Sequence, residues 1–150
     1  MATRWDLAGS PLPYEPDVLA SLVAAFVLTS PAFHQGGTIP KRYTCDGANV
    51  SPALRWTAPP VQTASFSLTV FDPDAPGGGF LHWHIARLPS SVRSLPAASR
   101  LGGTNGAGQS GWTGPCPPAG PAHHYRFTLR ALDRTGRVLA AARLVGLYRR

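Results

Sequence analysis

The chain has 150 residues, of which 43% are hydrophobic, 14% are charged, 16 are glycine and 16 are proline. This length predicts a single domain with a substantial core, and glycine and proline placed between apolar runs exclude a coiled coil, a helical repeat array and a disordered chain. No apolar run approaches the roughly 18 residues of a membrane-spanning helix, so we expect no stable membrane insertion.

Positive charge is concentrated in the second half of the sequence. The formal net charge is +7, with −2 in residues 1–75 and +9 in residues 76–150. Such asymmetry can attract a polyanion, but it is also typical of a solvated, arginine-rich surface. The basic residues are scattered and no nucleic-acid-binding motif accompanies them, so we expect no nucleic-acid partner.

The N-terminal residues differ from the rest of the chain. Residues 1–16 are polar and rich in proline, which is typical of a loose extension, and Pro16 and Asp17 favour the start of a short helix over residues 17–25. The apolar residues 18–28 have neither the basic flank nor the cleavage site of a secretion signal, which predicts a cytoplasmic protein. Cys45 and Cys116 allow one pairing, but in that compartment we expect reduced, buried thiols.

From residue 26 onwards, short strands alternate with turn residues. Residues 65–71, 81–88 and 125–131 alternate apolar and polar side chains, as half-buried strands do. One shared face is predicted for Phe66, Leu68 and Val70, and one for Leu81, Trp83 and Ile85. In the last of these strands Tyr125, Phe127, Leu129 and Ala131 are predicted to point inward. Residues 138–148 predict a helical turn that leads into a last strand. The whole pattern predicts a mainly β protein built as an antiparallel β-sandwich.

Several polar side chains lie where the predicted strands begin or end. Asp72 begins the sequence DPDAP directly after a strand, where two prolines stiffen the loop, although a turn capped by an aspartate has the same pattern. His82 and His84 lie on the face opposite Trp83. The alternation places His123 on the inward face with Tyr125, and His124 outward.

These residues leave three kinds of chemistry open. His82, His84, His123 and an aspartate have the side chains of a metal site, but the alternation does not show that they converge. Cys116, His123 and Asp72 have the residue types of a nucleophilic triad, without a G-x-S-x-G motif or a helix N-terminus at the cysteine. A half-buried histidine bonded to a backbone carbonyl is the structural alternative for each imidazole.

The segment Gly111–Gly120 (GWTGPCPPAG) favours a third kind of site. Its prolines donate no N–H, and its glycines leave backbone amides accessible to an oxygen-rich ligand. Phe80 and Trp112 offer apolar walls. Together with these open amides, an aspartate, two histidines and a tyrosine hydroxyl suit a small phosphoryl or carboxyl group with an attached amine.

Taken in order, these segments resemble the phosphatidylethanolamine-binding protein family, which includes Raf kinase inhibitor protein, and its bacterial branch in particular. The resemblance extends over residues 26–133 and 138–148. The matching segments are LTSPAF (28–33), IPKRYTCDG (39–47), NVSPALRW (49–56), DPDAP (72–76), HW (82–83), GPCPPAG (114–120) and HHY (123–125).

The resemblance implies one domain over residues 26–150, a β-sandwich with few short helices and a small anion pocket at one end. The implied ligands are phosphate, acetate and phospholipid headgroups, bound without catalysis and without a cofactor or metal. The alternatives are a protein-binding inhibitor of a protease or kinase and, third, a metal- or cysteine-dependent hydrolase. The implied ligand-binding residues are Asp72, Pro76, Phe80, His82, Gly114, Cys116, Pro117, His123 and Tyr125.

Two departures from the family pattern carry expectations of their own. Asp133 is followed almost at once by the last strand, so the C-terminal helical region is shortened and we expect a more open pocket. The N-terminal extension is longer than is usual in the family. The helix predicted over residues 17–25 would cover the surface that the shortening exposes, or mediate a homodimer.

Overall fold

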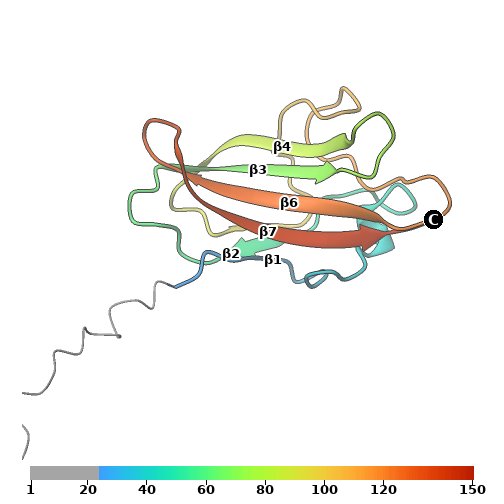
Figure 1. Cartoon of the computed structure of the whole chain (residues 1–150), viewed down its shortest axis with the longest axis horizontal. Helices are drawn as coiled ribbons and strands as arrows, with labels where there is room; N and C mark the ends of the chain where they lie inside the picture. The colour runs from blue at the N-terminus through green and yellow to red at the C-terminus, as the bar shows by residue number, and fades with distance from the viewer. Residues whose placement is uncertain (1–23) are drawn as a thin grey trace, which may run out of the picture.

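The computed structural model describes residues 24–150, so the predicted helix over residues 17–25 lies almost entirely outside the described residues. Seven strands and one 3-10 turn form the described part (Figure 1). One antiparallel sheet has the order β1-β2-β5 and the other has the order β4-β3-β6-β7. The elements are β1 (Leu28–Thr29), η2 (Lys41–Tyr43), β2 (Leu54–Trp56), β3 (Ser65–Asp72), β4 (Phe80–Pro89), β5 (Ser94–Leu95), β6 (His123–Leu132) and β7 (Val138–Tyr148).

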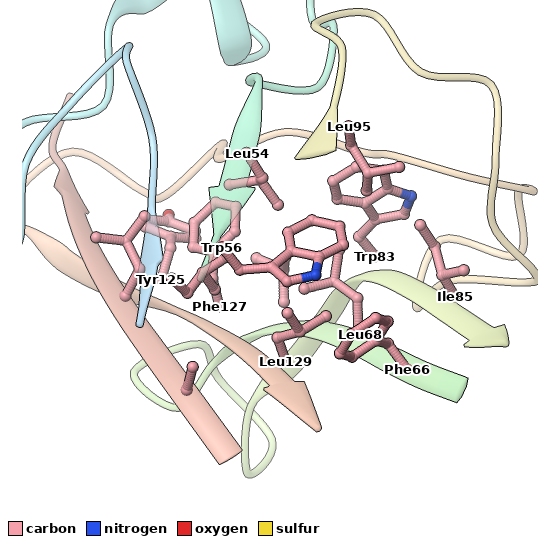
Figure 2. Close-up of a cluster of buried hydrophobic side chains, with 14 of the residues drawn as sticks. Leu54, Trp56, Phe66, Leu68, Trp83, Ile85, Leu95, Tyr125, Phe127 and Leu129 are labelled. Atoms are coloured by element: carbon pink, nitrogen blue, oxygen red, sulfur yellow. The ribbon is translucent and has the colours of Figure 1, made fainter. Parts of the chain in front are cut away.

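The two sheets pack face to face around one core, which confirms the predicted β-sandwich. Leu54 and Trp56 of the small sheet are buried in the same cluster as Phe66 and Phe127 of the large sheet (Figure 2). The rings of Trp56 and Phe66 meet edge to face with 5.6 Å between their centroids. Burial of apolar area of this kind is the dominant favourable contribution to folding.

Strands β3 and β6 form the centre of the large sheet, and their alternation is as predicted. Leu68 lies opposite Leu129 and Val70 opposite Phe127, and all four side chains are fully buried. Because side chains alternate along a strand, the same inner face continues to Asp72 at the end of β3. On β6 it continues through Tyr125 to His123. The apolar inner face therefore ends in polar side chains at one edge of the sandwich.

Strand β4 departs from the predicted alternation. Val70 pairs with Trp83, but the next residue, Phe71, pairs with Leu81, so a β-bulge leaves His82 without a partner on β3. A bulge turns two successive side chains toward one face. His82 and Trp83 are consequently both buried, whereas Leu81 is only partly buried. The prediction that Leu81 shares the face of Trp83 and that His82 lies on the opposite face is therefore wrong.

The chain after Asp133 forms a β-hairpin with no helical turn, which corrects the prediction for residues 138–148. Strand β7 pairs with β6 from Val138 to Tyr148. The Asp133 carboxylate accepts hydrogen bonds from the backbone N–H groups of Thr135 and Arg137, which closes the turn. The alanines of β7 favour a helix locally, but pairing along the whole of β6 outweighs that preference.

Cys45 and Cys116 form a disulfide across a sequence separation of 71 residues, so the expectation of reduced thiols is wrong in this structure. The bond joins the loop after η2 to the proline-rich segment around Cys116. Hydrogen bonds accompany it, because the N–H of Cys45 donates to the carbonyl of Pro115 and the indole N–H of Trp112 donates to the carbonyl of Tyr43. Alternation along strands cannot detect this contact, since both cysteines lie in loops.

We expect the double substitution of Cys45 and Cys116 by alanine to lower the free energy of unfolding by about 4 kcal/mol, because the disulfide closes a long loop in the unfolded chain. Urea denaturation of both proteins without reductant measures the difference. A thiol titration of the native protein provides the control. Two free thiols per chain under non-reducing conditions would contradict the disulfide.

Candidate functional site

The polar end of the inner face encloses a cavity of about 240 Å³. All nine residues that the family resemblance implied line it, and Ala75, Thr113 and Pro118 complete the lining. Asp72 comes from β3, His82 from the β4 bulge, and His123 and Tyr125 from β6. The proline-rich segment 113–118 forms the opposite wall. The fold therefore brings together side chains from four separate stretches of sequence.

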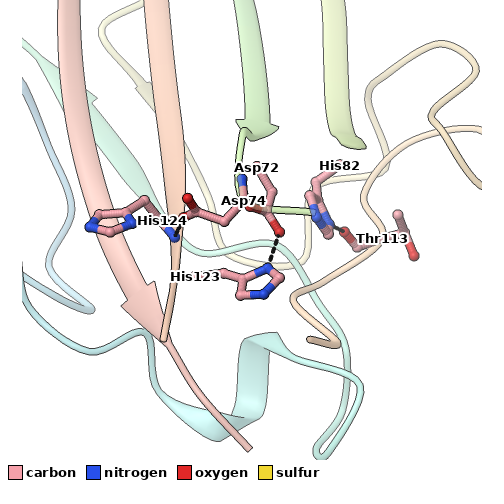
Figure 3. A network of polar contacts seen from close by, with 6 residues as sticks. All are labelled: Asp72, Asp74, His82, Thr113, His123 and His124. Carbon is pink, nitrogen blue, oxygen red and sulfur yellow. Dashed lines mark hydrogen bonds and ion pairs between the residues drawn. The ribbon is translucent and has the colours of Figure 1, made fainter. Parts of the chain in front are cut away.

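Asp72 organises one side of the cavity. The residue is 2% exposed, and Oδ2 of its carboxylate lies 2.7 Å from Nδ1 of His123 (Figure 3). Oδ1 accepts a hydrogen bond from the backbone N–H of Asp74 at 2.8 Å. Asp72 is therefore both a turn-capping residue and a residue of the candidate site, because Oδ1 caps the DPDAP loop and Oδ2 orients the imidazole of His123. A carboxylate that accepts from Nδ1–H leaves Nε2 of His123 free.

His82 is fixed from the other side. Its Nδ1 lies 2.7 Å from the carbonyl oxygen of Thr113, and a carbonyl can only accept, so Nδ1 carries the hydrogen and Nε2 is free (Figure 3). Phe80 and Tyr125 pack edge to face against its ring, with centroid distances of 4.7 and 5.1 Å. Burial lowers the pKa of His82 below its usual value of 6.5, because desolvation disfavours the imidazolium.

Tyr125 supplies a hydroxyl without a partner. The side chain is fully buried, and its oxygen makes no hydrogen bond to any described residue. Burial raises the pKa of this phenol far above its usual value, and the nearby carboxylates of Asp72 and Asp74 raise it further. The hydroxyl is therefore protonated and available as a donor at the polar end of the core.

The proline-rich wall differs from the expected backbone nest. The N–H of Gly114 donates to Oδ1 of Asn49 at 2.7 Å, so this amide is not free for a ligand. A Cβ at Gly114 would lie 2.3 Å from the carbonyl oxygen of Tyr43, which explains why glycine is needed there. Sequence reasoning missed this role of Asn49, because Asn49 and Gly114 are 65 residues apart and no local pattern connects them.

The other histidines do not join the site. His124 is exposed, and its Nδ1 lies 2.7 Å from Oδ2 of Asp74 at the outer rim. This hydrogen bond lowers the pKa of Asp74. His84 does not line the cavity. Within residues 24–150 no group of three or more His, Cys, Asp or Glu side chains is arranged to hold a metal ion.

Three larger cavities lie elsewhere in the described part of the molecule. One, of about 620 Å³, lies near the β6–β7 turn and includes Asp133, whose carboxylate is already used by the turn. The second, of about 520 Å³, lies on the outer face of the large sheet and includes Arg126, Arg130 and Arg143. The third, of about 420 Å³, lies beside β1 and includes His34, which is exposed. None of the three contains a buried titratable side chain, so the smaller cavity is the stronger candidate for a functional site.

Comparison with known proteins agrees with the resemblance in the sequence. The family model described as phosphatidylethanolamine-binding protein matches residues 29–148. The chain belongs to the phosphatidylethanolamine-binding protein family. A protein of Methanothermobacter thermautotrophicus named UPF0098 protein is 41% identical over 149 residues, which cover 82% of this chain and 98% of that protein.

Two solved structures of the family share the fold. Escherichia coli YbcL, described as a new member of the mammalian family, superposes with a TM-score of 0.78 at 31% identity and covers 85% of this chain and 99% of its own. The Chlamydia trachomatis homologue CT736 superposes with a TM-score of 0.78 at 33% identity, and the match covers 84% of this chain and 98% of that homologue.

The alignment with an Aquifex aeolicus relative, also named UPF0098 protein, runs over 170 residues, more than the 150 of this chain. That relative therefore contains residues that this chain lacks. The shortening is predicted directly after Asp133, and the β6–β7 turn formed there lies at the opposite end of β6 from His123. The expectation of a more open cavity stays a prediction.

The lowered pKa of His82 predicts an acid-sensitive contribution to stability. Below about pH 6.5 the imidazole of His82 takes up a proton in the unfolded chain, whereas in the folded protein it stays neutral down to its lowered pKa. The free energy of unfolding therefore falls as the pH decreases from about 6.5 to that lowered pKa. We expect His82→Asn, whose side-chain N–H can still reach the Thr113 carbonyl, to show a shallower decrease. A single histidine of this kind changes the free energy of unfolding by at most about 1.4 kcal/mol per pH unit.

Urea denaturation at about pH 7.5 and about pH 5.5 measures this effect, since the window lies below the usual histidine value. His84→Asn, on the same strand but outside the cavity, is the matched control for the substitution itself. Equal slopes for His82→Asn and the unsubstituted protein would contradict the assignment.

Proposed function

We propose that this chain is a non-catalytic binding protein whose cavity holds a small phosphoryl or carboxyl group, such as phosphate, acetate or a phospholipid headgroup. The observation that supports the proposal most directly is the unpartnered hydroxyl of Tyr125 at 0% exposure. Buried polar groups in folded proteins nearly always have a hydrogen-bond partner, and because Tyr125 lines the cavity, an oxygen of a bound ligand would supply one.

The surroundings of Tyr125 support the same ligand class. The free Nε2 atoms of His82 and His123 belong to residues that line the same cavity. A protonated imidazole donates to an oxyanion, and the Asp72 carboxylate would pair with the resulting charge. Pro76, Phe80 and Pro117 add apolar walls that limit the size of the ligand.

The hydrolase alternatives are less well supported. Cys116 is bonded to Cys45 and has no thiolate to act as a nucleophile in this structure. His82 and His123 are each bonded through Nδ1 to a protein oxygen, which fixes the orientation of both rings and does not by itself favour hydrolysis or binding. No contact among the described residues favours the other alternative, an inhibitor of a protease or kinase.

The cellular compartment stays a prediction. No helix within residues 24–150 is long and apolar enough to cross a membrane. A disulfide is typical of oxidising compartments, so the Cys45–Cys116 bond weighs against the cytoplasmic location that we predict from the sequence. The homodimer depends on residues 17–25, which lie almost entirely outside the described residues.

Calorimetric titration with inorganic phosphate tests the proposed function. We expect saturable binding by the unsubstituted protein, and an affinity about tenfold lower for Tyr125→Phe because one hydrogen bond to an anion is lost. Stability should not fall, since the substitution removes a hydroxyl that is unsatisfied without ligand.

Tyr43→Phe is the control, because Tyr43 does not line the cavity. An unchanged affinity for Tyr125→Phe would remove Tyr125 from the site. No saturable binding of phosphate up to millimolar concentration would overturn the function.

A further inference from the structure

The candidate site has an unusual balance of hydrogen-bond donors and acceptors. The side chains that line it include no lysine or arginine. While the imidazoles are neutral, the hydroxyls of Tyr125 and Thr113 are the side-chain donors, and the amide of Gly114 is already bound to Asn49. Pro76, Pro117 and Pro118 have no N–H to offer. The backbone N–H groups of Ala75 and Cys116, which also line the cavity, donate to no described residue, but for a site that would hold an anion the wall is poor in side-chain donors.

The acceptors, in contrast, are fixed by geometry. The Thr113 carbonyl takes the Nδ1 hydrogen of His82, so Nε2 of the neutral ring is a bare lone pair. The Asp72 carboxylate takes the Nδ1 hydrogen of His123 in the same way. Burial favours the neutral form of His82 at neutral pH. The lone pairs of an oxyanion without hydrogens would therefore face the lone pair on Nε2 of His82, and the two acceptors would repel each other.

The remaining charged and titratable groups near the cavity do not change this balance. Asp72 and Asp74 are the carboxylates close enough to raise the pKa of Tyr125, and Tyr148 of β7 adds a weaker effect of the same sign. Arg150 lies at the rim, where Nη1 is 3.8 Å from Sγ of Cys116 and Nε is 3.2 Å from Asp46. Its charge is already paired outside the cavity.

We infer that the site selects a phosphoryl group that still carries one proton, as in the monoanion of a phosphate monoester, whose P–OH donates to Nε2 of His82. This inference rests on the proposed anion-binding function and narrows its ligand class. The hydroxyl of Tyr125 donates to an unprotonated oxygen of the same group. Donor then meets acceptor at both contacts, and the phosphoryl group carries a single negative charge beside Asp72.

Methyl phosphate and dimethyl phosphate separate this inference from the proposed function. At about pH 5.5 both carry one negative charge, but only methyl phosphate has a P–OH group. We expect calorimetry to show methyl phosphate bound at least about tenfold more tightly, because dimethyl phosphate leaves a buried acceptor unpaired. Between about pH 6 and pH 8 the affinity for methyl phosphate should fall further than that for dimethyl phosphate, which does not titrate there.

Two substituted proteins locate the effect. His82→Asn removes Nε2 and keeps an N–H for the Thr113 carbonyl, so the preference for methyl phosphate should fall towards onefold. His84→Asn, on the same strand but outside the cavity, should keep the preference.

A second pair of probes, glycerophosphoethanolamine and glycerophosphocholine, tests the other source of a donor, because only the first has N–H groups and neither has a P–OH.

The outcomes are distinct. A methyl phosphate preference that His82→Asn abolishes supports the inference. Equal affinity for methyl and dimethyl phosphate overturns the inference and leaves the proposed function in place. A preference for glycerophosphoethanolamine over glycerophosphocholine, without one for methyl phosphate, assigns the donor to an ammonium and also overturns it. If none of the four probes binds, the proposed function fails as well.

Discussion

A buried carboxylate must find its partners inside the protein, and the Asp72 side chain finds two. Oδ1 accepts the N–H of Asp74 and thereby folds the DPDAP loop back on the end of β3. Oδ2 accepts from Nδ1 of His123 and sets the orientation of that ring. The position of one cavity wall and the direction of one free imidazole nitrogen both depend on this carboxylate. It is buried because it continues the inner face of β3 beyond Val70.

The facing wall depends on contacts between segments that are distant in sequence. The disulfide of Cys45 and Cys116 and the bond from the Gly114 amide to Asn49 hold residues 113–118 against the loop that follows η2. That segment in turn presents the Thr113 carbonyl to His82. The tautomer of His82, and with it the ligand chemistry inferred above, is therefore a consequence of how this loop is anchored.

The sequence predicts much of the fold, because alternating burial along β3 and β6 appears directly in their residues. The inward positions of Phe66, Leu68 and Val70, and of His123 and Tyr125 on β6, follow from that alternation. The bulge that turns His82 inward depends on pairing with β3, which no local pattern encodes. The helical preference of the β7 alanines misled the prediction for the same reason, since pairing with β6 decides their conformation.

Assembly of the site needed information of another kind. Composition and alternation placed Asp72 and His123 near strand ends and left several groupings open, including one with Cys116, but only the family resemblance joined them with Phe80, Cys116 and Pro117 in one anion pocket. The structure gathers all of these residues around one cavity. It also corrects their roles, because the Gly114 amide is bound to Asn49 and the Cys116 sulfur to Cys45.

The central claim is that His82 and His123 keep Nδ1 protonated and direct Nε2 toward a bound anion. Long-range ¹H–¹⁵N NMR of the histidine rings, recorded during titration with inorganic phosphate, tests it most directly. The account predicts that Nδ1 carries the hydrogen in both neutral rings, and that the Nε2 resonances shift saturably with phosphate while those of His84 do not. Neutral rings that carry the hydrogen on Nε2 instead of Nδ1, or imidazole spectra unchanged by phosphate, would contradict it.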